Sequence, residues 1–330
     1  MNPEAPKAAT EKATDKTPAR FSLWGLAEAF GAVASVCTIA GFAGELAWLL
    51  ELTTHFRLQY LVLLTGLAVL LAIGKRFKPA AVFFVGALLN VFVLAPWLLP
   101  SSAPSPAGTP FRVMVLNVNT ENTQHDRVLD EIRRIKPDVL LLMEVDTRWL
   151  HALRELSNSL PHTVLAPRED NFGIALFSRH PLAGAGVVEL GEAGVPSIVT
   201  TAEVGDRRLL IVGSHPLPPG SPENTRLRNA QLDKLAGAVV GQKLAAIVMG
   251  DLNATPWSPH FRKLELSASL RDTSRGAGWR PTWPTWFPPL WIPLDHCLVS
   301  PELAVADRFI GDKVGSDHYP VVVDLVLSTR

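Results

Sequence analysis

The chain has 330 residues, enough for one large domain or two ordinary ones, and its 31 lysines and arginines are balanced by 31 acidic residues. Zero net charge removes the simplest argument for a nucleic-acid-binding protein. A hydrophobic content of 48% with 19% charged residues excludes an intrinsically disordered chain. Two cysteines, Cys37 and Cys297, cannot form a disulfide framework and lack metal-binding spacing. Cys297 lies in an apolar run and is interpreted as a core residue.

The first hundred residues are unusually apolar. Residues 1–20 are polar and predict a disordered tail, and residues 21–99 contain three apolar runs at about 29–50, 58–74 and 79–99. As a helix, the first run would extend about 33 Å, enough to cross a hydrocarbon core of about 30 Å. The runs carry few charges and have no amphipathic period. We therefore predict three transmembrane helices rather than packed helices of a soluble protein.

Positive charges are distributed unevenly around these runs. Four lysines and arginines precede the first run, and Lys75, Arg76 and Lys78 lie between the second and third. Only Arg57 lies between the first and second. The positive-inside rule predicts a cytoplasmic N-terminus and second loop, with everything after residue 99 extracytoplasmic. The sequence thus predicts a multi-pass cell-membrane protein whose first partner is the lipid bilayer.

A single domain is expected after these helices. Residues 100–110 (PSSAPSPAGTP) form a stiff Pro/Ser linker, and residues 111–330 contain 23 basic and 25 acidic residues, a net charge of −2. The apolar runs predict strands at 111–118, 139–143, 174–177, 197–203, 208–213, 245–249, 294–299 and 321–327. Helical patterns are found at 128–135, 149–160 and 227–240. Strands outnumber helices, which favours a mixed α/β sandwich over a doubly wound parallel sheet.

Polar side chains stand next to the predicted buried strands, mostly just past their ends. They occur in six segments: Asn117 with Asn119, Glu144, Ser214 with His215, Asp251 with Asn253, Asp295 with His296, and Asp317 with His318. Each segment alone is an ordinary turn or loop sequence. Together they place oxygen ligands and imidazoles at the mouths of several rigid strands, and this pattern indicates metal-assisted attack on a phosphoester.

The residue types suit a magnesium site. Mg²⁺ prefers hard oxygen ligands and needs only one or two carboxylates, and Glu144 with Asn117 or Asn119 meets that need. A histidine-rich zinc site is not favoured, because only two of the nine histidines belong to this set.

The remaining polar residues have the types needed for proton transfer and charge stabilisation. His318, oriented by Asp295, is the predicted general base for an attacking water. His215 and Asn253 would donate to the phosphate oxygens, where negative charge builds up. Asp251 would either orient the nucleophile or bind a second metal ion.

The ordered motifs resemble those of the endonuclease/exonuclease/phosphatase superfamily over about 220 residues, 111–330. This resemblance implies a four-layer αββα sandwich, a Mg²⁺ or Mn²⁺ site and hydrolysis of a phosphate ester. The implied metal ligands are Glu144, Asn117, Asn119 and Asp317. Asn119 stands where nuclease members carry an acid, which leaves one negative charge fewer. His215 resembles the histidine of the nuclease and sphingomyelinase branches.

The three predicted membrane helices followed by this domain resemble the membrane phosphatases of vancomycin-resistance clusters (VanJ type). That subgroup is extracytoplasmic and is implicated with lipid-linked cell-wall precursors. The resemblance therefore implies a lipid-linked phosphate or diphosphate, including polyprenyl-linked ones, as substrate.

A tryptophan-rich segment precedes Asp295. Residues 279–294 contain four tryptophans and five prolines. Trp283 resembles a structural family residue, whereas Trp286 and Trp291 are candidates for contact with lipid, since tryptophan prefers the membrane interface. A rigid proline-rich cover over the sheet is the alternative for this segment.

Three functions remain open from the sequence. The first is an extracytoplasmic lipid phosphoester hydrolase, and the second is a membrane-anchored nuclease, for which Arg226 would bind one phosphate. The net charge of −2 disfavours the nuclease, because phosphate contacts from basic residues dominate nucleic-acid affinity. The third, a non-catalytic scaffold, is disfavoured because Glu144, Asp251, Asp295 and His318 are all present. The sequence predicts no protein partner.

Overall fold

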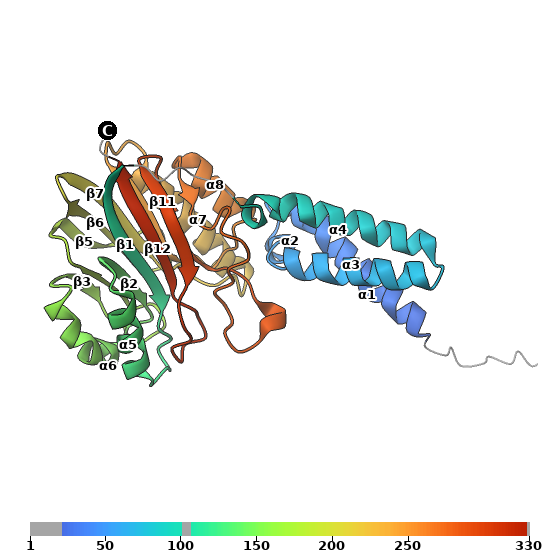
Figure 1. Ribbon diagram of the computed structural model, residues 1–330, viewed down its shortest axis with the longest axis horizontal. Coiled ribbons are helices and arrows are strands. Elements are labelled where there is room, and N and C mark those ends of the chain that lie inside the picture. Colours follow the sequence, from blue (N-terminus) through green and yellow to red (C-terminus); the bar gives the residue numbers. More distant parts are fainter. Residues whose placement is uncertain (1–21, 101–106, 329–330) are drawn as a thin grey trace, which may run out of the picture.

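The computed structural model describes residues 22–100 and 107–328, in which a helical bundle is attached to a larger two-sheet sandwich (Figure 1). The predicted tail at 1–20 and most of the predicted linker lie outside the described residues. Residues 108–110, predicted as linker, are instead the first three residues of a strand.

The bundle consists of three long helices and a short connection at one end. Its elements are α1 (Leu23–Ala40), the 3₁₀ turn η1 (Gly41–Ala43), α2 (Trp48–Leu52), α3 (Arg57–Ile73) and α4 (Phe77–Leu98). Two helical segments, Leu23–Ala43 and Phe77–Leu98, are long and apolar enough to cross a membrane.

The prediction of three transmembrane helices is therefore wrong in two respects. The run at 29–50 is broken, because the chain leaves the helix after residue 43 and starts the separate helix α2. The helix α3 has 17 residues, about 26 Å, which is shorter than a typical hydrocarbon core. Two apolar helices of sufficient length remain.

Large apolar side chains lie on the outside of the bundle as well as inside it. Leu64, Leu71 and Phe83 pack inside it, whereas Val36 and Phe92 are 65% and 79% exposed on its outside. A soluble helix normally buries its apolar stripe and turns polar residues to water. An exposed apolar surface of this kind is typical of a face that contacts either another protein or a membrane.

The sandwich contains two six-stranded sheets. The first has the order β11-β12-β1-β2-β4-β3, and the second has the order β5-β6-β7-β8-β10-β9. The strands of the first sheet are β1 (Gly108–Asn117), β2 (Val139–Met143), β3 (His162–Ala166), β4 (Ile174–Ser178), β11 (Leu303–Ile310) and β12 (Val321–Ser328). Those of the second are β5 (Leu182–Glu189), β6 (Pro196–Val204), β7 (Arg207–Ser214), β8 (Ala245–Asp251), β9 (Arg271–Asp272) and β10 (Asp295–Val299).

Helices cover the outer face of each sheet. The outer helices are α5 (His125–Ile135), α6 (Thr147–Ala152) and the 3₁₀ helix η2 (Leu153–Asn158) on the first sheet, and α7 (Pro222–Val239) and α8 (Pro259–Ser267) on the second. Both faces of the central strands are buried, so their sequences are continuously apolar. In β2, for example, Leu141 packs between the sheets and Leu140 packs under α5 and α6.

The predicted α/β two-sheet sandwich is confirmed, with differences at individual elements. The predicted helix at 149–160 divides into α6 and η2, and the sequence did not indicate β3, β5, β9, β11 or α8. Cys297 is fully buried in β10, between the sheets, as expected of a core residue.

Direct contacts hold the bundle against the sandwich. At the end of α4, the Trp97 ring lies edge-on to Trp257 with centroids 6.0 Å apart, and the backbone N–H groups of Gly276 and Gly278 donate to the carbonyls of Pro96 and Trp97. These contacts pack the bundle on the second sheet's side of the molecule.

Candidate active site

A cavity of about 680 Å³ contains most of the predicted site residues. Its lining includes Glu144, His215, Asp251, Asn253, Asp317 and His318. Asn117, Asn119 and Asp295 are hydrogen-bonded to these lining residues. The six sequence segments predicted to converge therefore do so.

Strand pairing explains the convergence. In the first sheet, β1 and β2 are parallel, and Asn117 pairs with Met143, the residue before Glu144. In the second sheet, β10 runs antiparallel to β8, and Asp295 stands directly opposite Asp251. Carboxyl ends of parallel strands meet at one edge of a sheet. The two sheets present these edges to the same cavity.

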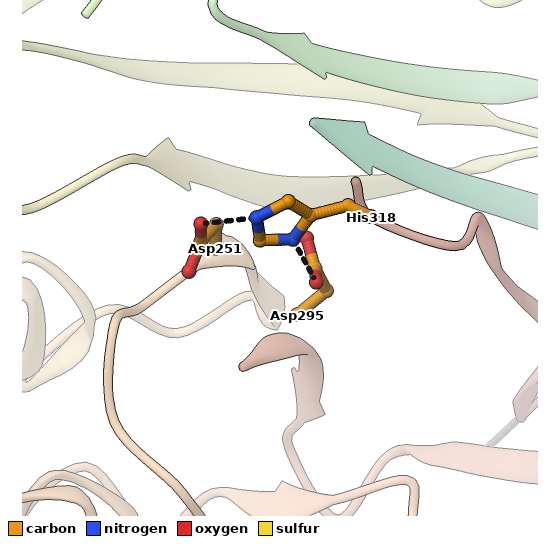
Figure 2. A group of neighbouring side chains, drawn as sticks. All are labelled: Asp251, Asp295 and His318. Carbon is orange, nitrogen blue, oxygen red and sulfur yellow. Dashed lines mark hydrogen bonds and ion pairs between the residues drawn. The ribbon is translucent and has the colours of Figure 1, made fainter. Parts of the chain in front are cut away.

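His318 lies between two carboxylates (Figure 2). Its Nδ1 is 2.8 Å from Oδ2 of Asp295, and its Nε2 is 3.6 Å from Oδ2 of Asp251. Burial alone would lower the pKa of His318, but Asp295 and Asp251 outweigh it and raise the pKa to about 10. The imidazole ring is therefore a donor at both nitrogens.

Asp251 is central to the cavity. Burial raises its pKa to about 6, against the attraction of His318. Its Oδ1 accepts from the backbone N–H of Asn253 at 3.0 Å, and its Oδ2 lies 3.5 Å from Nε2 of His215. Burial of His215 lowers the pKa of that imidazole. Asp251 thus faces one protonated and one neutral imidazole.

The Glu144 carboxylate is held by donors from Asn117 and Thr120. Nδ2 of Asn117 donates to its Oε1 at 2.8 Å, and the backbone N–H of Thr120 donates to its Oε2 at 3.1 Å. The sequence analysis did not identify Thr120, because its contribution is a backbone group. A carboxylate fixed in this way is oriented before any ligand binds.

Asp317 is oriented by an amide and an indole. Nδ2 of Asn119 donates to Oδ1 of Asp317 at 2.8 Å, and Nε1 of Trp283 donates to Oδ2 at 3.0 Å. Trp283, interpreted from the sequence as structural, both lines the cavity and positions this carboxylate. Asn119 orients Asp317 through Nδ2, and its Oδ1 accepts from the backbone N–H of Glu121 at 2.8 Å. Its role as a metal ligand stays a prediction.

The backbone at the site is strained. Asn119, Glu144 and Asn253 have φ values of 61°, 62° and 48°, a region that non-glycine residues rarely adopt. At Gly250, φ is +146° and a Cβ atom would lie 1.9 Å from the carbonyl oxygen of Ser214. Such conformations cluster at functional sites, where they aim side chains.

One wall of the cavity comes from the bundle. Leu52, His55 and Phe56, at the end of α2 and before α3, line it together with Ile292 and Leu294 of the sandwich. No sequence pattern indicates this contribution, since residues 52–56 resemble any short connection between apolar helices. The cavity thus has a polar side from the strand ends and an apolar side from the bundle.

The structure does not bring three predicted substrate-binding residues into this cavity. Arg226 projects from α7 into solvent, where it pairs with Glu223 at 2.9 Å and Glu192 at 3.1 Å. Trp286 is 65% exposed, and Trp291 is half-buried against Tyr319. None of the three lines the cavity. Contact of Trp286 and Trp291 with lipid stays a prediction.

The charge of the cavity fits a metal cation. Glu144, Asp170, Asp251 and Asp317 line it, and no lysine or arginine of the described residues does. A phosphate ester would be repelled by these carboxylates unless a cation balanced them. The sequence analysis did not single out Asp170.

Ligand atoms of Asp251, Asp295 and His318 lie within 4.8 Å of one another and form a metal-site-like cluster. Glu144 and Asp317 also line the cavity and add carboxylate oxygens of the kind that divalent cations prefer.

The chain was compared with known proteins. The model of the endonuclease/exonuclease/phosphatase family matches residues 114–318. A family protein of Beutenbergia cavernae is 24% identical, with a TM-score of 0.54, over 67% of this chain and 72% of its own. The human Nocturnin catalytic domain is 23% identical, with a TM-score of 0.54, over 68% and 97%. Truncated TDP2 of Caenorhabditis elegans is 18% identical, with a TM-score of 0.54, over 66% and 98%. No significant match was found among curated proteins.

The family model covers well over half of the chain, and its matched range includes every strand end that contributes a polar residue to the cavity. The solved structures share the two-sheet sandwich, and at sequence identities below 25% they support the fold alone. The motifs, the cavity and the family match agree with one another, and we conclude that this chain belongs to the endonuclease/exonuclease/phosphatase family and is a phosphoester hydrolase.

Proposed function

We propose that the protein is a divalent-metal-dependent hydrolase held in the membrane by its N-terminal bundle, and that it cleaves a lipid-linked phosphate or diphosphate. The observation that carries this proposal is the two-sided cavity. The His318–Asp295 pair, Asp251 and Glu144 form its polar side, and the bundle forms part of its apolar side.

The polar side has the groups for hydrolysis. Glu144, Asn117 and Asp317 would hold Mg²⁺ or Mn²⁺, which neutralises phosphate charge when bound. His318, held between two carboxylates, donates to a phosphate oxygen as negative charge develops there. Asp251 accepts the proton of the attacking water. The sequence suggested His318 as the base, but an imidazole flanked by Asp295 and Asp251 is better suited to donating.

The apolar side supports a substrate with a hydrocarbon group next to its phosphate. Leu52 and Phe56 of the bundle face Phe172, Ile292 and Leu294 of the sandwich around the same cavity. Its volume of about 680 Å³ lies in the usual range for small-molecule sites. A nucleic-acid backbone has no hydrocarbon chain that could contact this apolar wall.

The bundle's shape supports anchoring through α1 and α4. Lys75 and Arg76 lie in the turn before α4, at the end of the bundle remote from the sandwich (Figure 1). The positive-inside rule then favours a cytoplasmic location for that end and an extracytoplasmic sandwich. The resemblance to the VanJ type, with its lipid-linked substrates, forms part of this proposal.

The substrate class can be tested with one substrate panel. Purified full-length protein with Mg²⁺ should release phosphate from farnesyl diphosphate and leave plasmid DNA intact. His318→Gln should lower turnover at least 100-fold, because proton-transfer groups contribute about 10²–10⁴-fold. Unchanged turnover in this variant would contradict the assigned site, and DNA cleavage without lipid hydrolysis would favour a nuclease.

The apolar wall can be tested separately. Leu52→Ser should raise KM for farnesyl diphosphate and leave hydrolysis of p-nitrophenyl phosphate unchanged. The matched control is Leu165→Ser, which alters a leucine that is 41% exposed on β3 and outside the cavity. Equal effects of Leu52→Ser on both substrates would contradict a lipid-binding role for this wall.

A further inference from the structure

A second cavity, of about 210 Å³, is surrounded by arginines. Arg271, Arg275, Arg280 and Arg308 line it, and Asp307 is its only acidic lining residue among those that the structure describes. They come from the segment after α8 and from β11. This cavity shares no lining residue with the active site.

The positive charge here is incompletely balanced. Arg308 is 4% exposed, its Nε and Nη1 have no hydrogen-bond acceptor, and its Nη2 makes only a 3.4 Å contact with the carbonyl of Asp295. The nearby carboxylate of Asp272 already accepts from Ser274 and lies 3.5 Å from His296. A buried guanidinium with unmade hydrogen bonds is unfavourable unless further negative charge lies close to it.

The rim of this cavity is also unpaired. Arg271 and Arg280 are exposed, and neither side chain makes an ion pair with any described residue. Only Arg275 has a carboxylate partner, Glu265, at 2.8 Å. Like charges gathered without partners repel one another, and an anion with several oxygens would satisfy them together.

Arg275 connects this cavity to an apolar one. Its guanidinium lies 4.5 Å from the centre of the Trp97 ring, and it lines a neighbouring cavity of about 520 Å³ at the end of α4. Phe42, Phe92 and Val93 line that cavity too, and the first two are largely exposed on the outer surface of the bundle. An anion site and an apolar groove therefore meet where the bundle joins the sandwich.

We propose that these adjoining cavities bind an anionic phospholipid, with its phosphate among the arginines and an acyl chain along the apolar groove. An arginine-lined cavity next to an apolar groove suits a single amphiphile with an anionic headgroup. If α1 and α4 are inserted as proposed, the junction between bundle and sandwich lies at the level of the lipid headgroups. The inference rests on that insertion. It concerns a site separate from the hydrolytic cavity, so the bound lipid is a structural or regulatory ligand and not the substrate.

The test uses the full-length protein in detergent and three probes: dihexanoyl phosphatidylglycerol, dihexanoyl phosphatidylcholine and inorganic phosphate. Phosphatidylglycerol should raise the thermal unfolding midpoint most. In the double variant Arg271→Gln/Arg280→Gln its apparent Kd should increase at least tenfold. Without lipid, this variant should unfold at the same or a higher temperature, because it removes repulsion. The control is Arg154→Gln, an exposed arginine on η2 outside both cavities, which should bind lipid normally.

The acyl-chain part has its own test. Phe92→Ser should weaken phosphatidylglycerol binding and leave phosphate binding unchanged. Equal binding of phosphate and phosphatidylglycerol, lost in the double variant, would overturn the lipid assignment in favour of a free anion. Equal binding by wild type and double variant would overturn the site itself. Flotation with neutral phosphatidylcholine vesicles reports membrane insertion independently, so failure of the proposed anchoring is recognised separately.

Discussion

A buried ion pair between Glu51 and Arg228 joins the bundle to the catalytic sandwich, and its removal gives a sharp prediction. Nη2 of Arg228 lies 2.7 Å from Oε2 of Glu51, and the two side chains are 0% and 1% exposed. Oγ of Ser258 donates to the other carboxylate oxygen at 2.7 Å, and Nη1 of Arg228 donates to the carbonyl of Asn253. This pair therefore connects α2 to a residue of the active site.

In Glu51→Gln, the amide keeps the shape and can still bond to both Arg228 and Ser258, but the charge is lost. At 2.7 Å and an effective dielectric constant of about 20, the lost attraction is roughly 6 kcal/mol. Relaxation lowers the net loss, and removing one partner of a buried pair typically costs about 3–5 kcal/mol. We expect a loss of this size in the free energy of unfolding, measured with denaturant at fixed detergent.

A double-mutant cycle separates the pair from other effects. Arg228→Gln should also lower the free energy of unfolding. The loss in Glu51→Gln/Arg228→Gln should be smaller than the sum of the two single losses by about 2 kcal/mol or more. A loss below about 1 kcal/mol in Glu51→Gln would refute the reasoning, because it would mean that Arg228 finds water or another anion and that the bundle is not tightly docked.

Three further predictions follow from single residues. Burial lowers the pKa of His55 to about 3, so the stability that neutral His55 contributes is present above about pH 6.5 and is lost as pH falls towards 3. Between pH 7.5 and pH 5, the free energy of unfolding should therefore fall by about 2 kcal/mol more in wild type than in His55→Gln. Equal decreases in the two proteins would contradict a buried neutral imidazole. Glu144→Gln should raise the Mg²⁺ concentration for half-maximal activity at least tenfold in a metal titration, and an unchanged titration would exclude Glu144 as ligand. Gly250→Ala should lower the unfolding free energy by more than about 2 kcal/mol, because the added Cβ would clash with the Ser214 carbonyl. The control Gly237→Ala in α7 should not lower it as much, because no atom lies within 4 Å of a Cβ there.

The candidate site was the most predictable part of the molecule. Asn117, Glu144 and Asp251 each follow a run of buried strand residues, and strand ends are fixed by the sheet to which they belong. A polar residue at such a position is aimed by the backbone, so its place along the chain already carries spatial information. The order of the motifs supplied the rest, because the family resemblance joins segments far apart in sequence.

Contacts made only by tertiary packing were not predictable. The ion pair between Arg228 of α7 and Glu51 of α2 spans 177 residues, and no local sequence pattern indicates it. Among the tryptophans, Trp283 lines the cavity, whereas Trp286 and Trp291 do not. All three are tryptophans of one proline-rich segment, so residue type does not show which of them reaches the cavity, and the path of the loop decides it.

Composition predicted the apolar helices of the bundle but not where each of them ends. Apolar character identified the helices correctly, yet the run at 29–50 contains Gly41 and Gly44, where the helix gives way to a 3₁₀ turn and a loop. Glycine lowers helix propensity without interrupting an apolar run, so hydropathy alone cannot place this break. The break is what allows α2 to turn towards the sandwich and bring Leu52 to the active site.

This arrangement has a consequence for selectivity under the proposed function. A phosphoester on a lipid is confined to the bilayer surface, where the bundle holds the cavity, so tethering raises the local substrate concentration without any new contact. A soluble phosphoester gains nothing from the tether and nothing from the apolar wall of Leu52 and Phe56. The two effects are separable, because Leu52→Ser removes the wall and keeps the tether. If lipid preference in vesicles survives Leu52→Ser while preference in detergent disappears, confinement alone accounts for the remaining selectivity.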